Sequence, residues 1–331
     1  MADFGEHRSR SGGVVRSVVV IAVAVLGLAA AGVASADDPV AAPEVATTLH
    51  LGAGPMPDVA SDSSTHRAYI TSQGDDSLYV VDAASPVATI KVGPAPRFAA
   101  VDPTTQTAYV TTGDAVSVVD IASGTVTANV GVGSEPEGAE VDPDNHRLFI
   151  ANAGDDSVSV IDTVSRTVTA TIKVGDRPGK MGVDPTTHLL YVSNRGNASV
   201  AVVDPAESRV IDTIAVGRNP NDVALDPPTH TAYVPNSDDN SVSVLDLNRR
   251  AVVQTIPVGR QPSAATIDSD AHTVLVTNHS ESSVSVIDSQ KRVVADTVAV
   301  GEGPQTVAAD PTTHTAWVVN VRANSVSVLE R

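Results

Sequence analysis

The sequence predicts an all-β fold: a seven-bladed β-propeller of four-stranded antiparallel blades, with the ring closed by an N-terminal strand pairing in the last blade. Three observations predict it. A Gly-x-x-Pro element recurs at intervals of 40 to 42 residues, with its glycine at Gly52, Gly93, Gly133, Gly175, Gly217, Gly259 and Gly301. Each unit contains four short strand-like segments, and the last unit lacks its fourth. A period and content of this kind are typical of a propeller blade.

The unit that begins at Gly217 shows the elements in order. We expect strands over residues 221–226, 231–234, 241–245 and 251–258. Asp226-Pro227 ends the first, because aspartate and proline favour the opening positions of a type I turn. The second is β-branched and aromatic, and the third alternates polar and apolar residues, which indicates a half-buried strand. Gly259 ends the fourth and begins the next unit.

One position of the second strand is aromatic in most units. It holds Tyr69, Tyr109, Phe149, Tyr191, Tyr233, Leu275 and Trp317. Six of the nine aromatic residues in the chain are therefore used at a single repeat position. A second-strand position lies too far from the channel for ligand stacking, so we expect these rings to pack between adjacent blades.

The repeat phrase resembles the YVTN family of β-propeller repeats, also called YncE-like. The likeness is carried by Tyr191-Val192-Ser193-Asn194, by Ala316 to Asn320, and by the Thr-Ile-x-Val-Gly endings at 171–175 and 255–259. It extends from about residue 46 to the end of the chain. The resemblance implies a seven-bladed propeller that is usually exported, and it implies no single activity or catalytic motif.

The two ends of the array are complementary. Residues 46–52 are similar to a fourth strand such as Ala170 to Gly175, whereas the chain ends at the third-strand segment Ser325 to Leu329. We expect Thr47–Leu51 to pair beside Ser325–Leu329. Such pairing removes the free edges that an open stack of sheets would expose.

The first 36 residues are interpreted as a secretory signal peptide. Arg8, Arg10 and Arg16 precede an apolar run at 18–31, and Ala34-Ser35-Ala36 is a small-x-small cleavage site. The alternative is an uncleaved N-terminal anchor. Residues 37–45 are expected to be a short flexible lead, and residues 46–331 a single propeller domain. The expected location is outside the cell or in the cell envelope, with no integral membrane span after cleavage.

The chain is acidic and contains no cysteine. Without the three arginines and two acids of residues 1–36, the totals of 21 Lys+Arg and 39 Asp+Glu become 18 and 37. Sequence-independent nucleic-acid binding depends on Lys and Arg neutralising phosphates, so nucleic acid is not an expected partner. The absence of cysteine excludes disulfides, and we expect a monomer.

Six histidines share one repeat position, in the turn between first and second strands. They are His66, His146, His188, His230, His272 and His314, and the second unit has Gln106 there. Equivalent positions on separate blades lie far apart, whereas metal ligands must lie about 2 Å from one ion. We therefore expect no metal site, and turn residues whose imidazoles bond local backbone. His279 is different, because it lies in the loop between second and third strands.

No catalytic or cofactor signature was found. The Gly-x-Ser-x-Gly, His-Glu-x-x-His and phosphate-loop motifs are absent, and no cofactor is expected. The leading hypothesis is a non-catalytic scaffold that binds a protein, a glycan or a small polar ligand. The alternative is a lactonase- or lyase-like enzyme with its site at the channel mouth.

Candidate site residues are those that depart from the repeat near the channel mouth. The loop after Gly-x-x-Pro and the loop between second and third strands should open on the same face. The candidates are Arg97, Phe98, Glu137, Glu140, Lys180, Asp222 and His279. Glu140, for example, replaces small residues such as Ala224 and Ala308. The competing interpretation is a rim of solvated charges. The ligand hypothesis is a mixed-charge pocket in which arginine binds a carboxylate and Phe98 stacks on a ring or sugar face.

Overall fold

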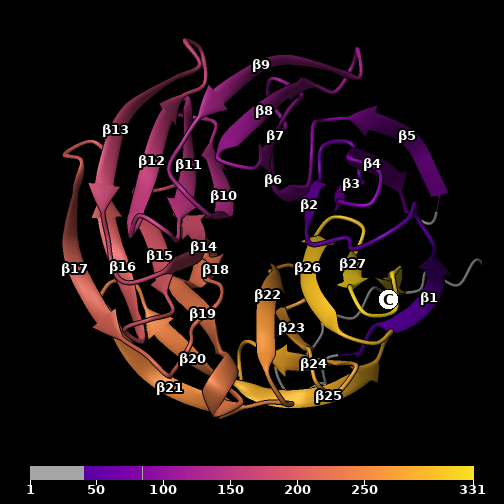
Figure 1. The fold of residues 1–331 in the computed structure, drawn as a ribbon. Coiled ribbons are helices and arrows are strands. Elements are labelled where there is room, and N and C mark those ends of the chain that lie inside the picture. Colours follow the sequence, from indigo (N-terminus) through magenta and orange to yellow (C-terminus); the bar gives the residue numbers. More distant parts are fainter. Residues whose placement is uncertain (1–40, 84) are drawn as a thin grey trace, which may run out of the picture. The chain divides into compact units, whose positions relative to one another are not determined.

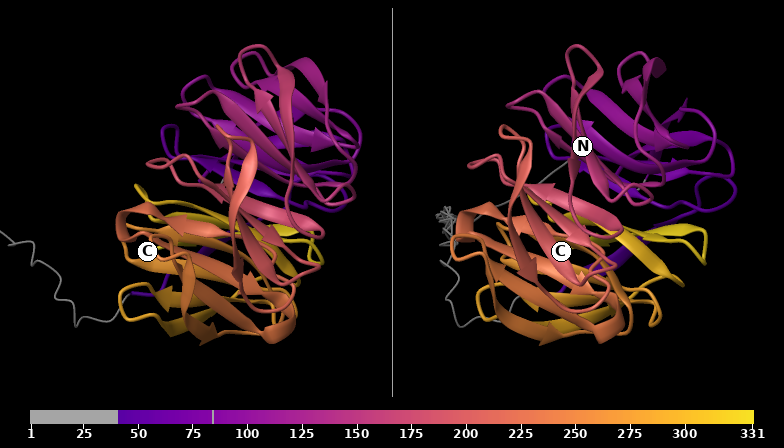
Figure 2. Two further views of the ribbon diagram at one scale, coloured as in Figure 1. Left: turned by 90° about the vertical axis from the view of Figure 1, so that its left-hand side faces the viewer. Right: turned by 60° about the vertical axis from the view of Figure 1, so that its left-hand side comes forward.

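A computed structural model describes residues 41–83 and 85–331, and the predicted signal peptide and residues 37–40 lie outside this part. The described residues form seven four-stranded antiparallel sheets arranged in a ring around a central channel (Figure 1). Side views show the sheets packed directly against one another (Figure 2). The described residues contain no helix that is long and apolar enough to cross a membrane.

In blades 1 to 6 the strands run in chain order from the channel outward, and in blade 7 the outermost strand is β1. Blade 1 contains β2 (Val59–Asp62), β3 (Arg67–Ser72), β4 (Ser77–Asp82) and β5 (Ser85–Lys91). Blade 2 contains β6 (Pro96–Asp102), β7 (Thr107–Thr112), β8 (Ala115–Asp120) and β9 (Thr125–Gly131). Blade 3 contains β10 (Pro136–Asp142), β11 (Arg147–Asn152), β12 (Ser157–Asp162) and β13 (Thr167–Lys173). Blade 4 contains β14 (Pro178–Val183), β15 (Leu190–Asn194), β16 (Ser199–Asp204) and β17 (Arg209–Ala215).

Blade 5 contains β18 (Ala224–Asp226), β19 (Thr231–Asn236), β20 (Ser241–Asp246) and β21 (Ala251–Pro257), with 3₁₀ turns η1 (Pro227–Thr229) and η2 (Ser237–Asp239). Blade 6 contains β22 (Pro262–Asp268), β23 (Thr273–Asn278), β24 (Ser283–Asp288) and β25 (Val293–Ala299). Blade 7 contains β26 (Pro304–Asp310), β27 (Thr315–Asn320), β28 (Ser325–Glu330) and β1 (Glu44–Leu49). The predicted first strand of blade 5 at 221–226 is therefore three residues too long at its start.

The N-terminal strand closes the ring as predicted, but at an earlier position. β1 pairs antiparallel with β28, with Thr47 opposite Val328 and Leu49 opposite Val326. The strand begins at Glu44 and ends at Leu49, so the expected bounds of 47–51 are wrong by two or three residues. Leu51 lies beyond the strand and is nevertheless buried in the core that joins blades 7 and 1.

The repeated aromatic position packs between blades, as predicted. Tyr69 of blade 1 is fully buried against Ala99 and Val101 of blade 2. Trp317 of blade 7 packs in the same way against Met56 and Val59 at the start of blade 1. The core is thus a set of inter-blade layers around the ring, which explains why each unit depends on its neighbours.

A buried asparagine at the end of the second strand accounts for the recurrence of the Gly-x-x-Pro glycine and of the two serines in Ser-Val-Ser. In blade 3, Asn152 Nδ2 donates to Ser159 Oγ at 2.9 Å, and Asn152 Oδ1 accepts from Gly133 N at 3.1 Å. A Cβ atom on Gly133 would lie 2.6 Å from Asn152 Cγ, so the close approach requires glycine. The equivalent asparagines are Asn194, Asn236, Asn278 and Asn320, each of which donates to the serine that begins its third strand. In blade 3 the Gly-x-x-Pro, Asn and Ser-Val-Ser positions therefore form one network, and blade 4 repeats the bond from Gly175 N to Asn194 Oδ1 at 3.1 Å.

The structure corrects the prediction that the imidazoles of the repeat-turn histidines bond local backbone. These histidines occupy left-handed turn positions, but the imidazoles of His66 and His188 bind aspartates of a neighbouring blade. His66 Nδ1 lies 2.8 Å from Asp310 Oδ2 of blade 7, and His188 Nδ1 lies 3.0 Å from Asp142 Oδ2 of blade 3. Asp310 and Asp142 thus each bind the next blade around the ring. The sequence could not show this, because the partners are more than forty residues apart.

Replacing His188 by alanine is expected to cost about 1 kcal/mol more than replacing His230, as for one hydrogen bond. Both histidines have positive φ, so alanine adds similar backbone strain at each, and of the two only His188 forms an inter-blade hydrogen bond among the described residues. Chemical denaturation of the two variants measures the difference. Equal losses, or a stoichiometric metal lost with either histidine, would contradict this interpretation.

Candidate functional site

Several side chains that line the channel come from one repeat position, four residues before the aspartate at or just after the end of the innermost strand. This position holds Asp58, Phe98, Gly138, Lys180, Asp222, Ala264 and Thr306. The innermost strands converge on the channel, so charged residues far apart in the chain meet there (Figure 1). Six different residue types occupy this position in the seven blades, and the scaffold is the same in all of them, which is what a site built on a repeat requires.

Lys180 crosses the channel from blade 4. Its Nζ donates to Asp58 Oδ1 at 2.5 Å and to Thr306 Oγ1 at 2.9 Å. Thr306 Oγ1 donates in turn to Asp58 Oδ1 at 3.0 Å. Because Lys180 lines the cavities on both sides of this bridge, the bridge divides the channel into two spaces. We call them the mouth pocket and the turn-side chamber.

The mouth pocket lies on the face of the Gly-x-x-Pro loops and has a volume of about 310 Å³. Glu137 accepts from two arginines: from Arg97 Nη2 at 2.8 Å and from Arg195 Nη2 at 2.9 Å. The Arg97 guanidinium lies 5.5 Å from the centre of the Phe98 ring. Glu137 therefore fixes both guanidinium groups, that of Arg97 beside the Phe98 ring, and Lys180 also lines the pocket.

As predicted, the loop after Gly-x-x-Pro and the loop between the second and third strands lie on the same face. The backbone N–H of Arg195, between the second and third strands, donates to the carbonyl of Arg177 in the Gly-x-x-Pro loop at 3.1 Å. Arg195 Nε is buried next to Gly179 and has no hydrogen-bond partner in the described part of the chain. The charged residues that line the pocket are Arg97, Glu137, Lys180 and Arg195. Cations thus predominate at the mouth of an acidic protein.

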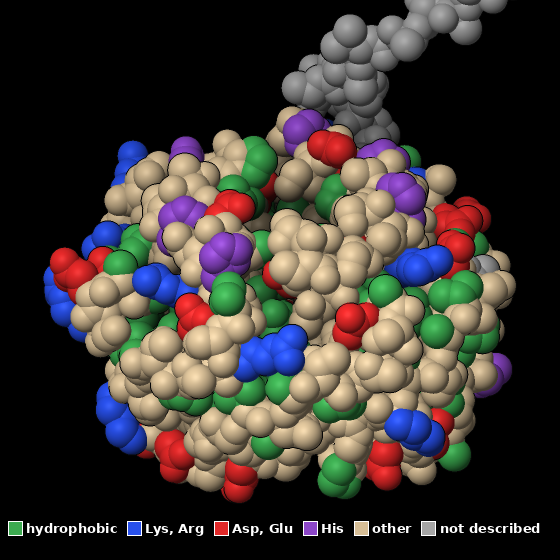
Figure 3. Space-filling model, turned by 90° about the horizontal axis from the view of Figure 1, so that it is seen from above, with side chains coloured by type: hydrophobic (Ala, Val, Ile, Leu, Met, Phe, Trp, Pro, Cys, Tyr) green, Lys and Arg blue, Asp and Glu red, His purple; other side chains and the backbone are tan. Residues whose placement is uncertain are grey.

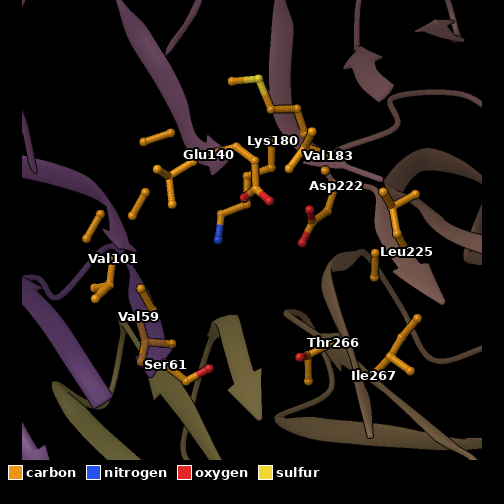
Figure 4. A pocket seen from close by; sticks show the side chains of 18 of the residues that line it. Val59, Ser61, Val101, Glu140, Lys180, Val183, Asp222, Leu225, Thr266 and Ile267 are labelled. Carbon is orange, nitrogen blue, oxygen red and sulfur yellow. The ribbon is translucent and has the colours of Figure 1, made fainter. Parts of the chain in front are cut away.

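The turn-side chamber opens on the face of the Asp-Pro turns and has a volume of about 630 Å³. Glu140, Lys180 and Asp222 direct their polar ends into it from neighbouring elements (Figure 4). Its charged lining residues are Asp58, Asp62, Glu140, Lys180 and Asp222, so acids predominate. Its wall includes the aliphatic side chains of Val101, Val183, Leu225 and Ile267.

The pKa values of these groups depend on burial and on one another. Burial raises the pKa of Glu140 to about 8; the backbone N–H of Val183 and the charge of Lys180 lower it, and the charge of Asp222 raises it further. Burial also raises the pKa of Asp222, although Lys180 and the N–H groups of Ala265 and Val223 oppose the shift. Burial lowers the pKa of Lys180, but Asp58 and Asp222 outweigh it and the net pKa is raised. Lys180 is therefore charged at neutral pH, while Glu140 is mostly protonated.

His279 is separated from the other candidates. It is not among the residues that line the mouth pocket or the turn-side chamber. Its Nδ1 is buried without a partner among the described residues. Burial lowers the pKa of His279, and the charge of Arg322 lowers it further.

The structure therefore places six of the seven predicted site residues in two cavities. Arg97, Phe98 and Glu137 line the mouth pocket, and Glu140 and Asp222 line the turn-side chamber. The six were predicted to share one mixed-charge pocket, and the bridge between Lys180 and Asp58 separates them. Their roles in binding stay predictions.

Sequence reasoning missed Asp58, Arg195 and Thr306. Asp58 and Thr306 occupy the same repeat position as Lys180 and Asp222, so aligning that position through the first and last units would have found them. Arg195 was visible as the charged member of a loop position that is uncharged in blade 3 and blade 5, where Ala153 and Ser237 occur.

Comparisons with known proteins agree with the architecture. No family model and no curated protein matches the chain. Among solved structures, a chain of hydrazine synthase from Kuenenia stuttgartiensis superposes with a TM-score of 0.72 at 20% identity. The match covers 86% of this chain and 98% of that chain. The fold is that of a seven-bladed β-propeller. At this identity the likeness shows the fold alone, and the resemblance to the YVTN repeat stays an expectation.

Proposed function

We propose that this propeller is a non-catalytic binding protein whose mouth pocket takes a small organic anion with a planar or ring-shaped body. The observation that carries the proposal is the Arg97–Glu137–Arg195 cluster beside Phe98. Arginine binds carboxylates through paired N–H donors, and an aromatic face binds planar groups. A volume of about 310 Å³ is within the usual range of small-molecule sites.

The charge of the pocket supports an anion. The whole chain carries a formal net charge of −18, and the side of the ring in Figure 3 shows acidic and basic side chains interspersed. Arg97 and Arg195 share a single carboxylate, that of Glu137, so the positive charge of the pair is only half compensated. An entering carboxylate would complete the compensation in a partly desolvated site.

The lactonase- or lyase-like alternative has less support. A histidine paired with a carboxylate was the minimum requirement for general-base catalysis there. The described residues that line the two cavities include no histidine. The proposal also keeps the extracytoplasmic location, which depends on the signal-peptide interpretation of residues 1–36.

Benzoate is a suitable first probe, with benzamide as its uncharged counterpart. We expect benzoate to bind by isothermal titration calorimetry, and Arg97→Gln or Arg195→Gln to weaken it at least tenfold, or about 1.4 kcal/mol. Arg260→Gln is the matched control, because Arg260 lies on an exposed loop outside both cavities and pairs with Glu281. Two results would contradict the proposal. One is that benzamide binds as tightly as benzoate, and the other is that Arg260→Gln lowers the benzoate affinity as much as Arg195→Gln does.

A further inference from the structure

The turn-side chamber has features that the mouth pocket does not share. It is the larger of the two spaces, at about 630 Å³ against about 310 Å³. The bridge between Lys180 and Asp58 forms its inner end, and its charged lining is acidic except for Lys180. A ligand suited to the mouth pocket would therefore be repelled here.

We propose that the turn-side chamber is a second binding site, which takes a small organic amine with a short aliphatic body. The ammonium group would lie at the inner end, between Asp222 and Glu140. The aliphatic body would lie along the wall formed by Val101, Val183, Leu225 and Ile267 (Figure 4).

The first support is that the protein itself places an ammonium group, that of Lys180, at the inner end of the chamber. Lys180 Nζ, at the end of an aliphatic chain, is bound by the carboxylate of Asp58 and the hydroxyl of Thr306. Asp222 occupies the same repeat position as Asp58, and it also accepts a backbone N–H of the next blade, from Ala265 N at 3.2 Å. Asp222 receives no side-chain donor among the described residues, whereas Asp58 receives Lys180.

The second support is Glu140, which the scaffold does not require. The equivalent residues of the other blades are Ala60, Ala100, Gly182, Ala224, Thr266 and Ala308. None carries a charge, and the six blades form the same sheets. Blade 3 alone places a carboxyl group here, and it faces the chamber beside Asp222 (Figure 4). The backbone N–H of Val183 donates to this carboxyl group, but burial still raises its pKa to about 8, so its charged form would gain from a cationic partner.

The third support is the chemistry of the lining. Aliphatic wall residues favour an alkyl body through burial of apolar surface. The described residues that line the chamber include no aromatic side chain, so they offer none of the cation–π contacts that favour quaternary ammonium groups. No group of three or more His, Asp or Glu within residues 41–83 and 85–331 is arranged to hold a metal ion. A primary ammonium, with three N–H donors, fits this donor-poor end best.

Glu140 gives the site a measurable proton signature. The charged groups that act on it are Lys180 of β14, Asp222 next to β18 and Asp142 of its own strand, with Asp58 beside Lys180. Its pKa of about 8 means that Glu140 holds a proton at pH 7. An ammonium ion favours the carboxylate, so binding should release that proton. Affinity should then rise from pH 6 to 9, until alkylamines lose their own charge near pH 10.4.

The test titrates the whole protein with n-butylamine hydrochloride at pH 7 in buffers of different ionisation enthalpy. We expect one site per chain and the release of up to about one proton per amine. Glu140→Ala, which introduces the residue of four other blades, should still fold, abolish proton release and weaken binding at least tenfold. Asp222→Asn should weaken binding at least tenfold as well. Glu281→Gln, an exposed acid outside both cavities, is the control and should change neither quantity.

Several results would overturn the proposal. These are no saturable binding of butylamine, equal binding of neutral n-butanol, or unchanged amine affinity in Glu140→Ala and Asp222→Asn. Magnesium or calcium binding that depends on the same two residues would replace the amine by a divalent cation. Because benzoate and butylamine probe different cavities, failure of one proposal leaves the other measurable.

Discussion

Removing residues 41–51 is expected to lower the melting temperature by roughly 10–20 °C, at about 2–4 °C per kcal/mol for a domain of this size. The strand β1 supplies the fourth strand of blade 7, and Leu49 and Leu51 are 9% and 3% exposed in the core that joins blades 7 and 1. Burial of two leucines contributes about 3–6 kcal/mol. The loss of β1 also leaves β28 as an unpaired edge.

The control is the chain that begins at residue 41, which keeps β1 intact. A peptide of residues 41–51, added to the shortened chain, should restore part of the melting temperature by pairing with β28. Identical melting curves for chains that begin at 41 and at 52 would mean that β1 contributes little to ring closure.

Breaking the cross-channel ion pair should have the second large effect. Removing one partner of a buried pair costs about 3–5 kcal/mol, because the other charge stays buried and uncompensated. Asp58 is 3% exposed, and the Lys180 ammonium is enclosed between it and Thr306. We therefore expect Lys180→Met and Asp58→Asn each to lower the free energy of unfolding by about 3 kcal/mol.

The double variant separates the lost attraction between Lys180 and Asp58 from any other destabilisation that each substitution causes. If the pair is coupled, Asp58→Asn with Lys180→Met should be clearly less destabilised than the sum of the single losses. The matched control is Arg209→Met, because Arg209 and Glu207 form an exposed pair whose removal should cost less than about 1 kcal/mol. Additive losses in the double variant, measured by chemical denaturation, would show that Lys180 and Asp58 do not act as a bridge.

The architecture was predictable because the repeat encodes it locally. Each unit carries its own turns, strand pattern and aromatic packing residue, so the seven blades and ring closure followed from periodicity alone. The error in β1, which begins at Glu44 rather than at residue 47, arose because the pairing partner and not local sequence sets where an edge strand begins.

The site was predictable only in part. Departure from the repeat identified Arg97, Glu137, Glu140, Lys180 and Asp222, since a position that is free to vary can carry charge without loss of the fold. It could not show that they belong to two cavities of opposite charge. Nor could it show that His66 and His188 bind aspartates of the preceding blade, because both facts depend on which residues face one another across or around the ring.

The sequence by itself therefore determined the number of blades, their internal order and the positions at which they differ. The tertiary structure alone decided which of those positions meet. Lys180 and Asp58 are separated by 122 residues, and only closure of the ring brings an ammonium and a carboxylate together in the channel. Local periodicity contains no information about that contact, because it joins side chains of blades 1 and 4, which are not neighbours in the ring.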